Sequence, residues 1–315
     1  MANNQRTALV TGGAGFIGSH LVDALVARGD SVAVIDDMST GKSGYLNPAA
    51  ELYGMDIGDD DVSNVMKAVR PDVVFHVAAQ ISVSVSAREP KFDAETNILG
   101  SLNILDAMNA AGAPKMVFVS TGGAMYGEPE TLPAPETLPA RPAAPYGASK
   151  LAVENYLPVY KMLRGIDYSI IRPANVYGPR QDPHGEAGVV AIFTRAMLAG
   201  QPVRIFGDGT DERDYVYVED VVDALIRASN CPGTGPYNIG SGFGTSVNDI
   251  ASRLAGLTGY SGEPERLPPR PGDLRRISLD ASLAKKDLGW SPTTSLNDGL
   301  RQTVDWFRSE MSARA

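Results

Sequence analysis

Tyr146 and Lys150, in the stretch Tyr-Gly-Ala-Ser-Lys, are the pair of residues in this chain best suited to move a proton. Residues four apart share one face of a helix, so the phenol and the ammonium would lie together. A phenol has a pKa of about 10 and is a poor base at neutral pH. Lowering that pKa by ~3 units needs about 4 kcal/mol, which one ammonium at ~4 Å supplies in an effective dielectric of ~20. We therefore expect Tyr146 to act as a general base whose pKa Lys150 holds down.

Chance alone would produce roughly 0.3 such pairs in a chain of this composition, and the alternative is an exposed pair near the start of a helix. The position of the pair favours the catalytic interpretation. It follows a predicted strand, Met116 to Ser120, and then a loop, Thr121 to Pro145, that leaves the same edge of the predicted sheet.

A glycine-rich loop near the N-terminus has the pattern of a dinucleotide site. The loop joins an apolar run, Thr7 to Val10, to an amphipathic segment that begins at Phe16. Such a loop lets backbone approach a pyrophosphate closely and directs amides at it from a helix N-terminus. A lone glycine pattern is weak, but here a predicted strand and helix flank it. We expect the cofactor to contact Gly12, Gly15, Phe16, Ile17 and Gly18.

Asp36 and Asp37 end the second predicted strand, Ser31 to Ile35. Asp36 lies 18 residues after Gly18, close to the ~20 expected for a carboxylate that binds the ribose hydroxyls of the adenosine. Because a carboxylate repels a 2′-phosphate, we predict NAD rather than NADP. The alternative is that the two aspartates begin a solvated turn.

Strands alternate with helices along the first half of the chain, which predicts an α/β fold built on a Rossmann-type doubly wound parallel sheet. The predicted strands are 7–10, 31–35, 52–55, 73–76, 116–120 and 168–172, and the predicted helices after the first are 59–69, 90–111 and 146–163. The carboxyl ends of parallel strands share one edge, so the residues that follow these strands should converge there.

After Arg172 the alternation weakens, and we predict a smaller, irregular α/β substrate domain. The expected division is 1–177 for the NAD-binding domain, with 212–240 rejoining it, and 178–211 with 241–315 for the second domain. Predicted elements are strands 203–206, 215–218 and 237–239, and helices 189–198, 221–229, 246–257 and 296–311. The unit Pro-Glu-Thr-Leu-Pro-Ala occurs twice over Pro129 to Ala140. It suggests a proline-stiffened loop beside the crevice, serving either as a lid or as a surface spacer.

The composition is that of a globular protein, with 43% hydrophobic and 21% charged residues in 315. A formal net charge of -9 argues against a nucleic-acid or anionic membrane partner. One cysteine excludes an internal disulfide, which together with the absence of a leader-like or span-length apolar stretch leads us to expect a cytoplasmic protein. Three scattered histidines give no expectation of a metal site.

These motifs, taken together, resemble the extended short-chain dehydrogenase/reductase family over nearly the whole chain. Later segments, Asn175 to Pro179, Arg213-Asp214-Tyr215 and Arg270 to Asp273, resemble the nucleotide-sugar branch of that family, most closely its UDP-glucose 4-epimerases. The resemblance implies further cofactor contacts from Asp56, Ile57, Val77, Ala78, Ala79, Asn97, Tyr146, Lys150 and Pro173. It implies substrate contacts from Asn175, Val189, Arg213, Arg270, Asp273 and Ile277. For each arginine the alternative is a solvated surface charge.

The implied reaction inverts C4 of a UDP-sugar. Tyr146 would take the proton of the 4-hydroxyl while C4 gives hydride to NAD, and hydride would return to the opposite face of a transient 4-keto sugar. Where the family places a serine or threonine, four residues before Tyr126, this chain has Gly122. Thr121, Ser120 or a water molecule would have to replace that hydroxyl. Gly122 and Gly123 also stand where related dehydratases carry an acidic pair, and this difference favours epimerisation.

Ile277 stands where glucose-selective relatives carry a bulky aromatic residue, which suggests tolerance of N-acetylated UDP-hexoses; the alternative is that Ile277 packs in the core. Other functions remain open, namely a UDP-glucuronate 4-epimerase or decarboxylase, or a non-catalytic NAD-sensing regulator. The helices 90–111 and 146–163 resemble those that join subunits in relatives. We therefore expect a homodimer, with Ile98, Leu102 and Leu105 exposed on its face.

Overall fold

The computed structural model describes residues 5–184, 188–269 and 274–313. Its larger part is built on a seven-stranded sheet with only parallel pairings. The strands are β1 (Thr7–Thr11), β2 (Ser31–Asp36), β3 (Glu51–Gly54), β4 (Val73–His76), β5 (Lys115–Val119), β6 (Asp167–Pro173) and β10 (Tyr237–Ile239). Their spatial order is β10-β6-β5-β4-β1-β2-β3, so the chain reverses direction across the sheet between β1 and β4. That reversal is the place where Rossmann-type sheets bind dinucleotides.

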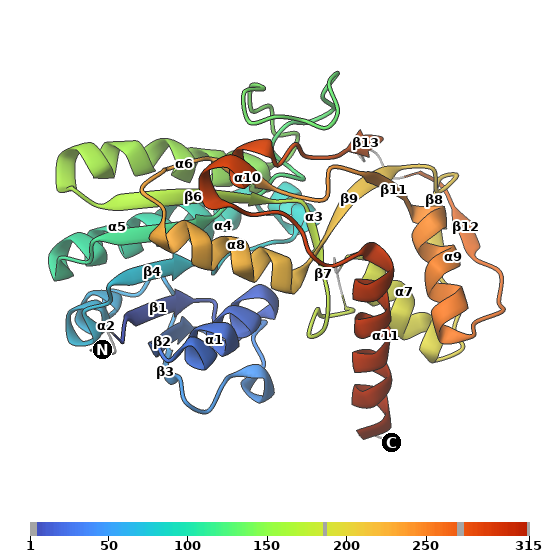
Figure 1. Ribbon diagram of the computed structural model, residues 1–315, viewed down its shortest axis with the longest axis horizontal. Coiled ribbons are helices and arrows are strands. Elements are labelled where there is room, and N and C mark those ends of the chain that lie inside the picture. Colours follow the sequence, from blue (N-terminus) through green and yellow to red (C-terminus); the bar gives the residue numbers. More distant parts are fainter. Residues whose placement is uncertain (1–4, 185–187, 270–273, 314–315) are drawn as a thin grey trace.

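Helices cover both faces of this sheet, as the sequence predicts (Figure 1). In β1, Ala8 and Val10 belong to one buried cluster and Leu9 to the other, because side chains alternate along a strand. The first cluster contains the inner faces of α1 (Phe16–Arg28) and α8 (Val218–Asn230). The second contains those of α2 (Val62–Val69), α5 (Gly100–Ala111) and α6 (Pro145–Arg164).

The smaller part has its own sheets and its own buried cluster. A four-stranded mixed sheet consists of β7 (Asn175–Tyr177), β9 (Glu212–Tyr217), β11 (Gly244–Ser246) and β13 (Arg276–Ile277), while β8 (Arg204–Phe206) pairs with β12 (Glu265–Leu267). The cluster beside them draws on α7 (Val189–Leu198), α9 (Val247–Thr258) and α11 (Leu296–Ala313). Ser246 caps α9 through its hydroxyl, which accepts from the Asp249 amide at 3.1 Å.

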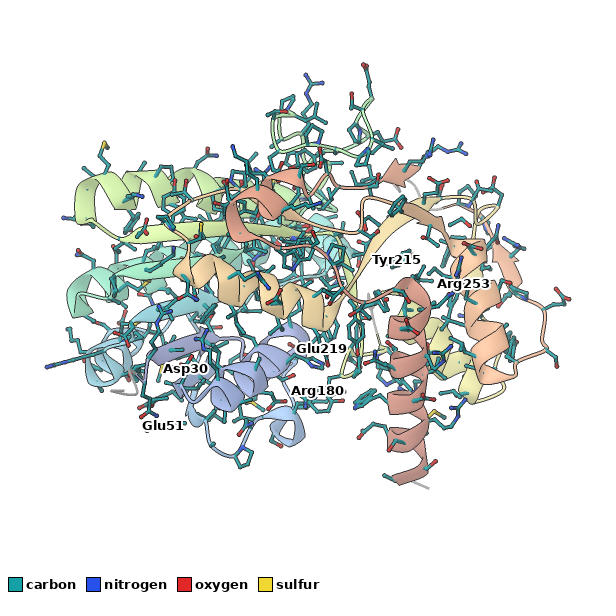
Figure 2. The ribbon with its side chains drawn as sticks, viewed as in Figure 1. Asp30, Glu51, Arg180, Tyr215, Glu219 and Arg253 are labelled. Atoms are coloured by element: carbon teal, nitrogen blue, oxygen red, sulfur yellow. The ribbon has the colours of Figure 1, made fainter. Side chains whose placement is uncertain are left out.

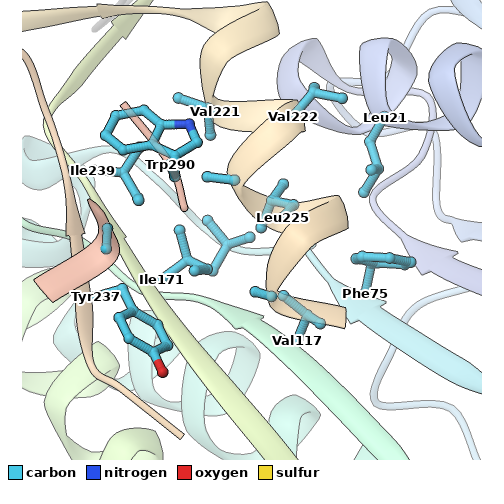
Figure 3. Packing of buried hydrophobic residues seen from close by; sticks show 14 of the residues in the cluster. Leu21, Phe75, Val117, Ile171, Val221, Val222, Leu225, Tyr237, Ile239 and Trp290 are labelled. Carbon is cyan, nitrogen blue, oxygen red and sulfur yellow. The ribbon is translucent and has the colours of Figure 1, made fainter. Parts of the chain in front are cut away.

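The chain crosses between the two parts more often than the sequence suggests. We expected the strand at 215–218 to rejoin the large sheet, but β9 lies at the centre of the small sheet. Within the segment 212–240, α8 and β10 are the elements that return to the large sheet. Residues after β13 return as well. Trp290, after α10 (Ser282–Leu288), is fully buried beside Val221 and Ile239, and its indole donates to the Asp220 carbonyl at 2.8 Å (Figure 3). Long-range packing of this kind leaves no local signal in the sequence.

Two helical details also differ from the prediction. A short helix, α3 (Val83–Arg88), precedes the predicted helix 90–111, and that helix is divided into α4 (Pro90–Ala94), the π-helical turn η2 (Glu95–Leu99) and α5. π turns are rare and occur often at functional sites. Within the described ranges, no helix is both long and apolar enough to cross a membrane.

Side chains bridge the two parts beyond the carboxyl edge of the sheet. Arg180 lies between α1 and α11 and pairs with Asp23 of α1 at 2.7 Å (Figure 2). Tyr45, in the 3-10 turn η1 (Ser43–Tyr45), makes an edge contact with Trp306 of α11, with ring centres 6.0 Å apart. These contacts join the two parts of the molecule.

Candidate functional site

The glycine loop lies against the end of β4, at the reversal of strand order. Gly12 has a φ of 71°, and a Cβ there would lie 2.8 Å from the backbone of Ala78. A Cβ on Gly18 would lie 2.0 Å from the Gly12 carbonyl oxygen, so α1 can approach the loop only because residue 18 has no side chain. The loop therefore needs glycine at both positions, for backbone geometry and for close packing.

The start of α1 is suited to a pyrophosphate. The N-cap residue Gly15 contributes no side-chain hydrogen bond, and no acidic residue lies in the first turn. The amides of a first helical turn lack intrahelical acceptors, and the helix dipole favours negative charge there. These features fit the cofactor expected from the sequence, and the first turn that contains Phe16 and Ile17 has free backbone donors of the kind a pyrophosphate needs.

The two aspartates at the end of β2 differ in burial and in hydrogen bonding. Asp36 is buried, and its carboxylate accepts from the Ala14 amide at 2.8 Å and from the Met38 amide at 2.9 Å. It is thus fixed against the glycine loop. Asp37 is exposed and accepts from the amide and hydroxyl of Ser39, as in a solvated turn.

The segment 77–80 forms the other wall of the crevice, and Asn97 holds it in place. Asn97 accepts from the Gln80 amide at 2.9 Å and donates to the Gln80 carbonyl at 2.9 Å. The half-buried Val77, Ala78 and Ala79 precede Gln80. Other predicted cofactor residues lie at the same edge: Asp56 is exposed after β3, while Ile57 and Pro173 are buried.

A hydrogen-bond chain that we did not predict supports this wall. Ser101 donates to the Asn97 carbonyl at 2.6 Å, so its oxygen must accept from Nε2 of His76, 2.9 Å away. Nδ1 of His76 then accepts from the Thr11 hydroxyl at 2.7 Å. Burial lowers the pKa of His76 to about 3, with a smaller contribution from Lys150, so the ring is neutral. The sequence feature that could have indicated this hydrogen-bond chain is a histidine at the end of a predicted apolar strand.

Tyr146 and Lys150 lie together in the first turns of α6, but the expected lowering of the tyrosine pKa is wrong for the protein alone. Burial and the nearby charge of Asp93 raise the pKa of Tyr146 to about 12, against a hydrogen bond from Thr121 that lowers it. Lys150 donates instead to the Val119 carbonyl at 2.9 Å. Burial lowers the pKa of Lys150 to about 8. Desolvation therefore outweighs the attraction that we expected between the two side chains.

The structure distinguishes the two hydroxyls proposed to replace the one missing at Gly122. Ser120 is buried and donates to the Glu154 carboxylate at 2.5 Å, and Glu154 also pairs with Arg172 at 2.5 Å. Thr121 accepts from the Ala124 amide at 3.3 Å, and its side chain lowers the pKa of Tyr146. Ser120 thus belongs to a buried ion-pair network, whereas Thr121, also buried, acts on Tyr146.

Gly122 has no room for the side chain that the family usually places there. A Cβ would lie 2.9 Å from the Arg172 carbonyl oxygen, 3.2 Å from that of Pro173 and 2.3 Å from the end of the Leu279 side chain. The backbone atoms cannot yield without moving β6. The missing hydroxyl is therefore a consequence of how closely this loop packs.

The predicted substrate residues are only partly brought together. The Asn175 side chain points at the 120–123 loop, since its Oδ1 would lie 3.2 Å from a Cβ on Gly123. Arg213 is half-buried in β9, and Val189 begins α7. Ile277 pairs with Arg213 but is only 2% exposed within the large core cluster, which agrees with the alternative of a packing role. Arg270 and Asp273 lie outside the described residues.

The repeated loop is anchored rather than free. Ala134, at the end of the first copy, is fully buried and pairs with the segment around Leu279. Glu136, in the second copy, accepts from the Asn238 amide of β10 at 2.8 Å. The middle of the repeat is therefore bound to the larger part of the molecule.

Fold and crevice together define a dinucleotide-dependent α/β protein with a tyrosine and a lysine beside the cofactor cradle. The chain belongs to the NAD dependent epimerase/dehydratase family, whose model matches residues 8–240. A UDP-glucose 4-epimerase of Mycolicibacterium smegmatis is 49% identical over 308 residues, covering 96% of this chain and 98% of that protein.

Solved structures agree. The UDP-glucose 4-epimerase of Thermotoga maritima with UDP-glucose is 50% identical with a TM-score of 0.95, covering 97% of this chain and 99% of that one. The Thermus thermophilus UDP-glucose 4-epimerase complex with NAD is 47% identical with a TM-score of 0.91, covering 96% and 99%.

Gly122→Ser tests the packing around this loop. We expect it to lower the free energy of unfolding by about 1–3 kcal/mol, because the added atoms meet backbone carbonyls in a filled space. Urea denaturation measures the change. Gly256→Ser is the matched control, since a Cβ on that exposed helical glycine meets nothing within 4 Å. Equal stability of the two variants would contradict the packing explanation.

Proposed function

We propose that this protein is an NAD-dependent epimerase that inverts C4 of a UDP-hexose, interconverting UDP-glucose and UDP-galactose. The observation that carries the proposal is the placement of Tyr146 and Lys150, four residues apart in α6, beside the end of β5 in the sheet that bears the glycine loop, with Lys150 donating to the Val119 carbonyl at 2.9 Å. The full-length likeness to proteins named as UDP-glucose 4-epimerases supports the substrate class.

In this reaction bound NAD takes up the hydride from C4 of the sugar and returns it. Tyr146 takes the proton of the 4-hydroxyl and later gives it back, and Thr121 keeps that phenol oriented. A pKa of about 12 makes Tyr146 a poor base by itself, so the positive charge of the nicotinamide must add to that of Lys150. Tyr146 would therefore ionise at neutral pH only when the cofactor is bound.

Arg213 and Asn175 are the described residues that we assign to the UDP moiety, together with Arg270 and Asp273 by resemblance. The chain has a formal net charge of -9, so a diphosphate can bind only where local cations and donors offset that field. Asn175 and Arg213 lie on the neighbouring strands β7 and β9 of the small sheet, which supports a nucleotide site between the two parts of the molecule.

We also propose that two copies assemble through α4, η2 and α6. The exposed apolar side chains there are Phe92, Leu99, Tyr156, Val159, Met162 and Leu163. Of the residues that we predicted to be exposed, Leu105 is fully buried against the sheet, and Ile98 and Leu102 are half-buried. α5 turns Leu105 inward, toward Met66 of α2 and the sheet.

Tyr146→Phe tests the proposed chemistry against a role in sensing NAD. We expect C4 inversion to fall by at least about a hundredfold, because the phenyl ring cannot accept the proton. Proton NMR of UDP-galactose, UDP-N-acetylglucosamine and UDP-glucuronate, each incubated separately with enzyme, measures the conversion and the sugar preference. Wild-type protein that converts none of them, or a variant with wild-type turnover, would disprove the proposal.

Thr121→Ala and Ser120→Ala separate the two hydroxyls. We expect Thr121→Ala to slow turnover about tenfold or more, since it removes a hydrogen bond to Tyr146. Ser120→Ala should mainly reduce stability, because it leaves Glu154 with one donor fewer. Thr121→Ser is the control that restores the hydroxyl. Turnover that is lost in Ser120→Ala but kept in Thr121→Ala would reverse the assignment.

Leu99→Glu tests the assembly. It places a charge at the centre of the apolar face, and we expect the protein to sediment as a monomer where wild type sediments as a dimer. Analytical ultracentrifugation makes the measurement. Leu52→Glu, on the edge strand β3, is the control for a charge placed at a different exposed leucine. A monomeric wild type at micromolar concentration would overturn the proposal.

A further inference from the structure

Asp93, in α4, is a completely buried carboxylate that no sequence motif singled out. One oxygen accepts from the Gln80 amide group at 2.9 Å and from that of Asn97 at 3.0 Å. The other accepts from the Ser149 hydroxyl at 2.6 Å. Three neutral donors thus solvate a charge that is costly to bury, without a salt bridge of its own.

Ser149 is what places this charge beside the catalytic pair. It precedes Lys150 directly and lies three residues after Tyr146, within one turn of α6. The carboxylate that receives its proton therefore lies against the helix surface from which both catalytic side chains arise. A negative charge there favours the ammonium over the amine at Lys150 and the phenol over the phenolate at Tyr146.

The other titratable groups of this centre are already committed. Glu154 lies one turn beyond Lys150 and is neutralised by Arg172. His76 is neutral, with both ring nitrogens in hydrogen bonds. Burial lowers the pKa of Lys150, and the negative charge of Asp93, followed by that of Glu154, opposes this shift. Among the described residues, the hydrogen-bond donors to Asp93 are all neutral, and its charge favours the protonated form of Lys150.

We propose that Asp93 is a positioning residue that keeps the proton on both Tyr146 and Lys150, acting through its contact with Ser149. It does not touch the reacting atoms. It couples three segments, since its partners lie in the 77–80 wall, in the π turn η2 and in α6. The effect on turnover rests on the proposed function, whereas the effect on ionisation of Tyr146 does not.

Asp93→Asn removes the charge and keeps the shape. Its oxygen can accept from Gln80 and Asn97, and its NH2 can donate to the Ser149 oxygen, so all three contacts persist. We expect Tyr146 to ionise at a pH lower by about one unit or more. The profile of kcat/KM against pH should shift to lower pH by a similar amount, because a phenolate forms more easily. A purely structural residue would lower activity without moving that profile.

Ionisation is read directly by carbon NMR of protein labelled at Cζ of its twelve tyrosines, with Tyr146→Phe assigning the signal. Asp106→Asn, which removes an exposed carboxylate of α5 that contacts Tyr160, is the control and should leave the titration of Tyr146 near wild type. If thermal melting shows that Asp93→Asn is unfolded, Asp93→Ala takes its place, because it removes the same charge. An unchanged titration in the folded variant overturns the proposal. Absence of C4 inversion in wild type would instead contradict only the proposed function.

Discussion

The close contact between the glycine loop and the end of β4 is the constraint on which the rest of the site depends. Gly12 approaches the backbone of Ala78 more closely than any side chain would allow, and Gly18 brings α1 onto that same loop. The contact fixes the distance between the two walls of the crevice. Thr11 extends it, because its hydroxyl accepts from the amides of Val77 and Ala78 and donates to His76. The cofactor cradle is therefore rigid before any ligand enters.

Buried charges next to this cradle set the proton affinities of Tyr146 and Lys150. Lys150, Asp93, Glu154 and Arg172 are all nearly inaccessible to water, and each is satisfied by partners from a different element. Taking one charge away would leave its partner uncompensated in a medium of low dielectric. The proton affinities of Tyr146 and Lys150 thus follow from an arrangement that spans α4, β5, β6 and α6. This arrangement raises the pKa of Tyr146, so under the proposed function the phenol acts as a base only with the added positive charge of the bound cofactor.

The division of labour among the hydroxyls follows from the same network. Ser120 supports Glu154, so it is withdrawn from the crevice, and Thr121 is left to contact Tyr146. Gly122 is glycine because the carbonyls of β6 and the side chain of Leu279 occupy the space around it. Leu279 itself arrives from the far end of the chain, along with Trp290. The C-terminal segment thereby shapes the loop that carries the proposed catalytic threonine.

The sequence by itself determined the class of fold, the alternation of strands and helices along the NAD-binding part, the glycine loop and the tyrosine and lysine of α6. These are local patterns, since apolar periodicity, glycine spacing and a helical i, i+4 step are all written within a few residues. Only the tertiary structure decided that β9 joins the small sheet, that Leu105 faces inward and that Asp93 lies beside Ser149. Each of these depends on contacts between residues far apart in the chain, and so does the desolvation that sets the pKa of Tyr146. Burial is a property of the whole packed molecule, so no stretch of sequence states it in advance.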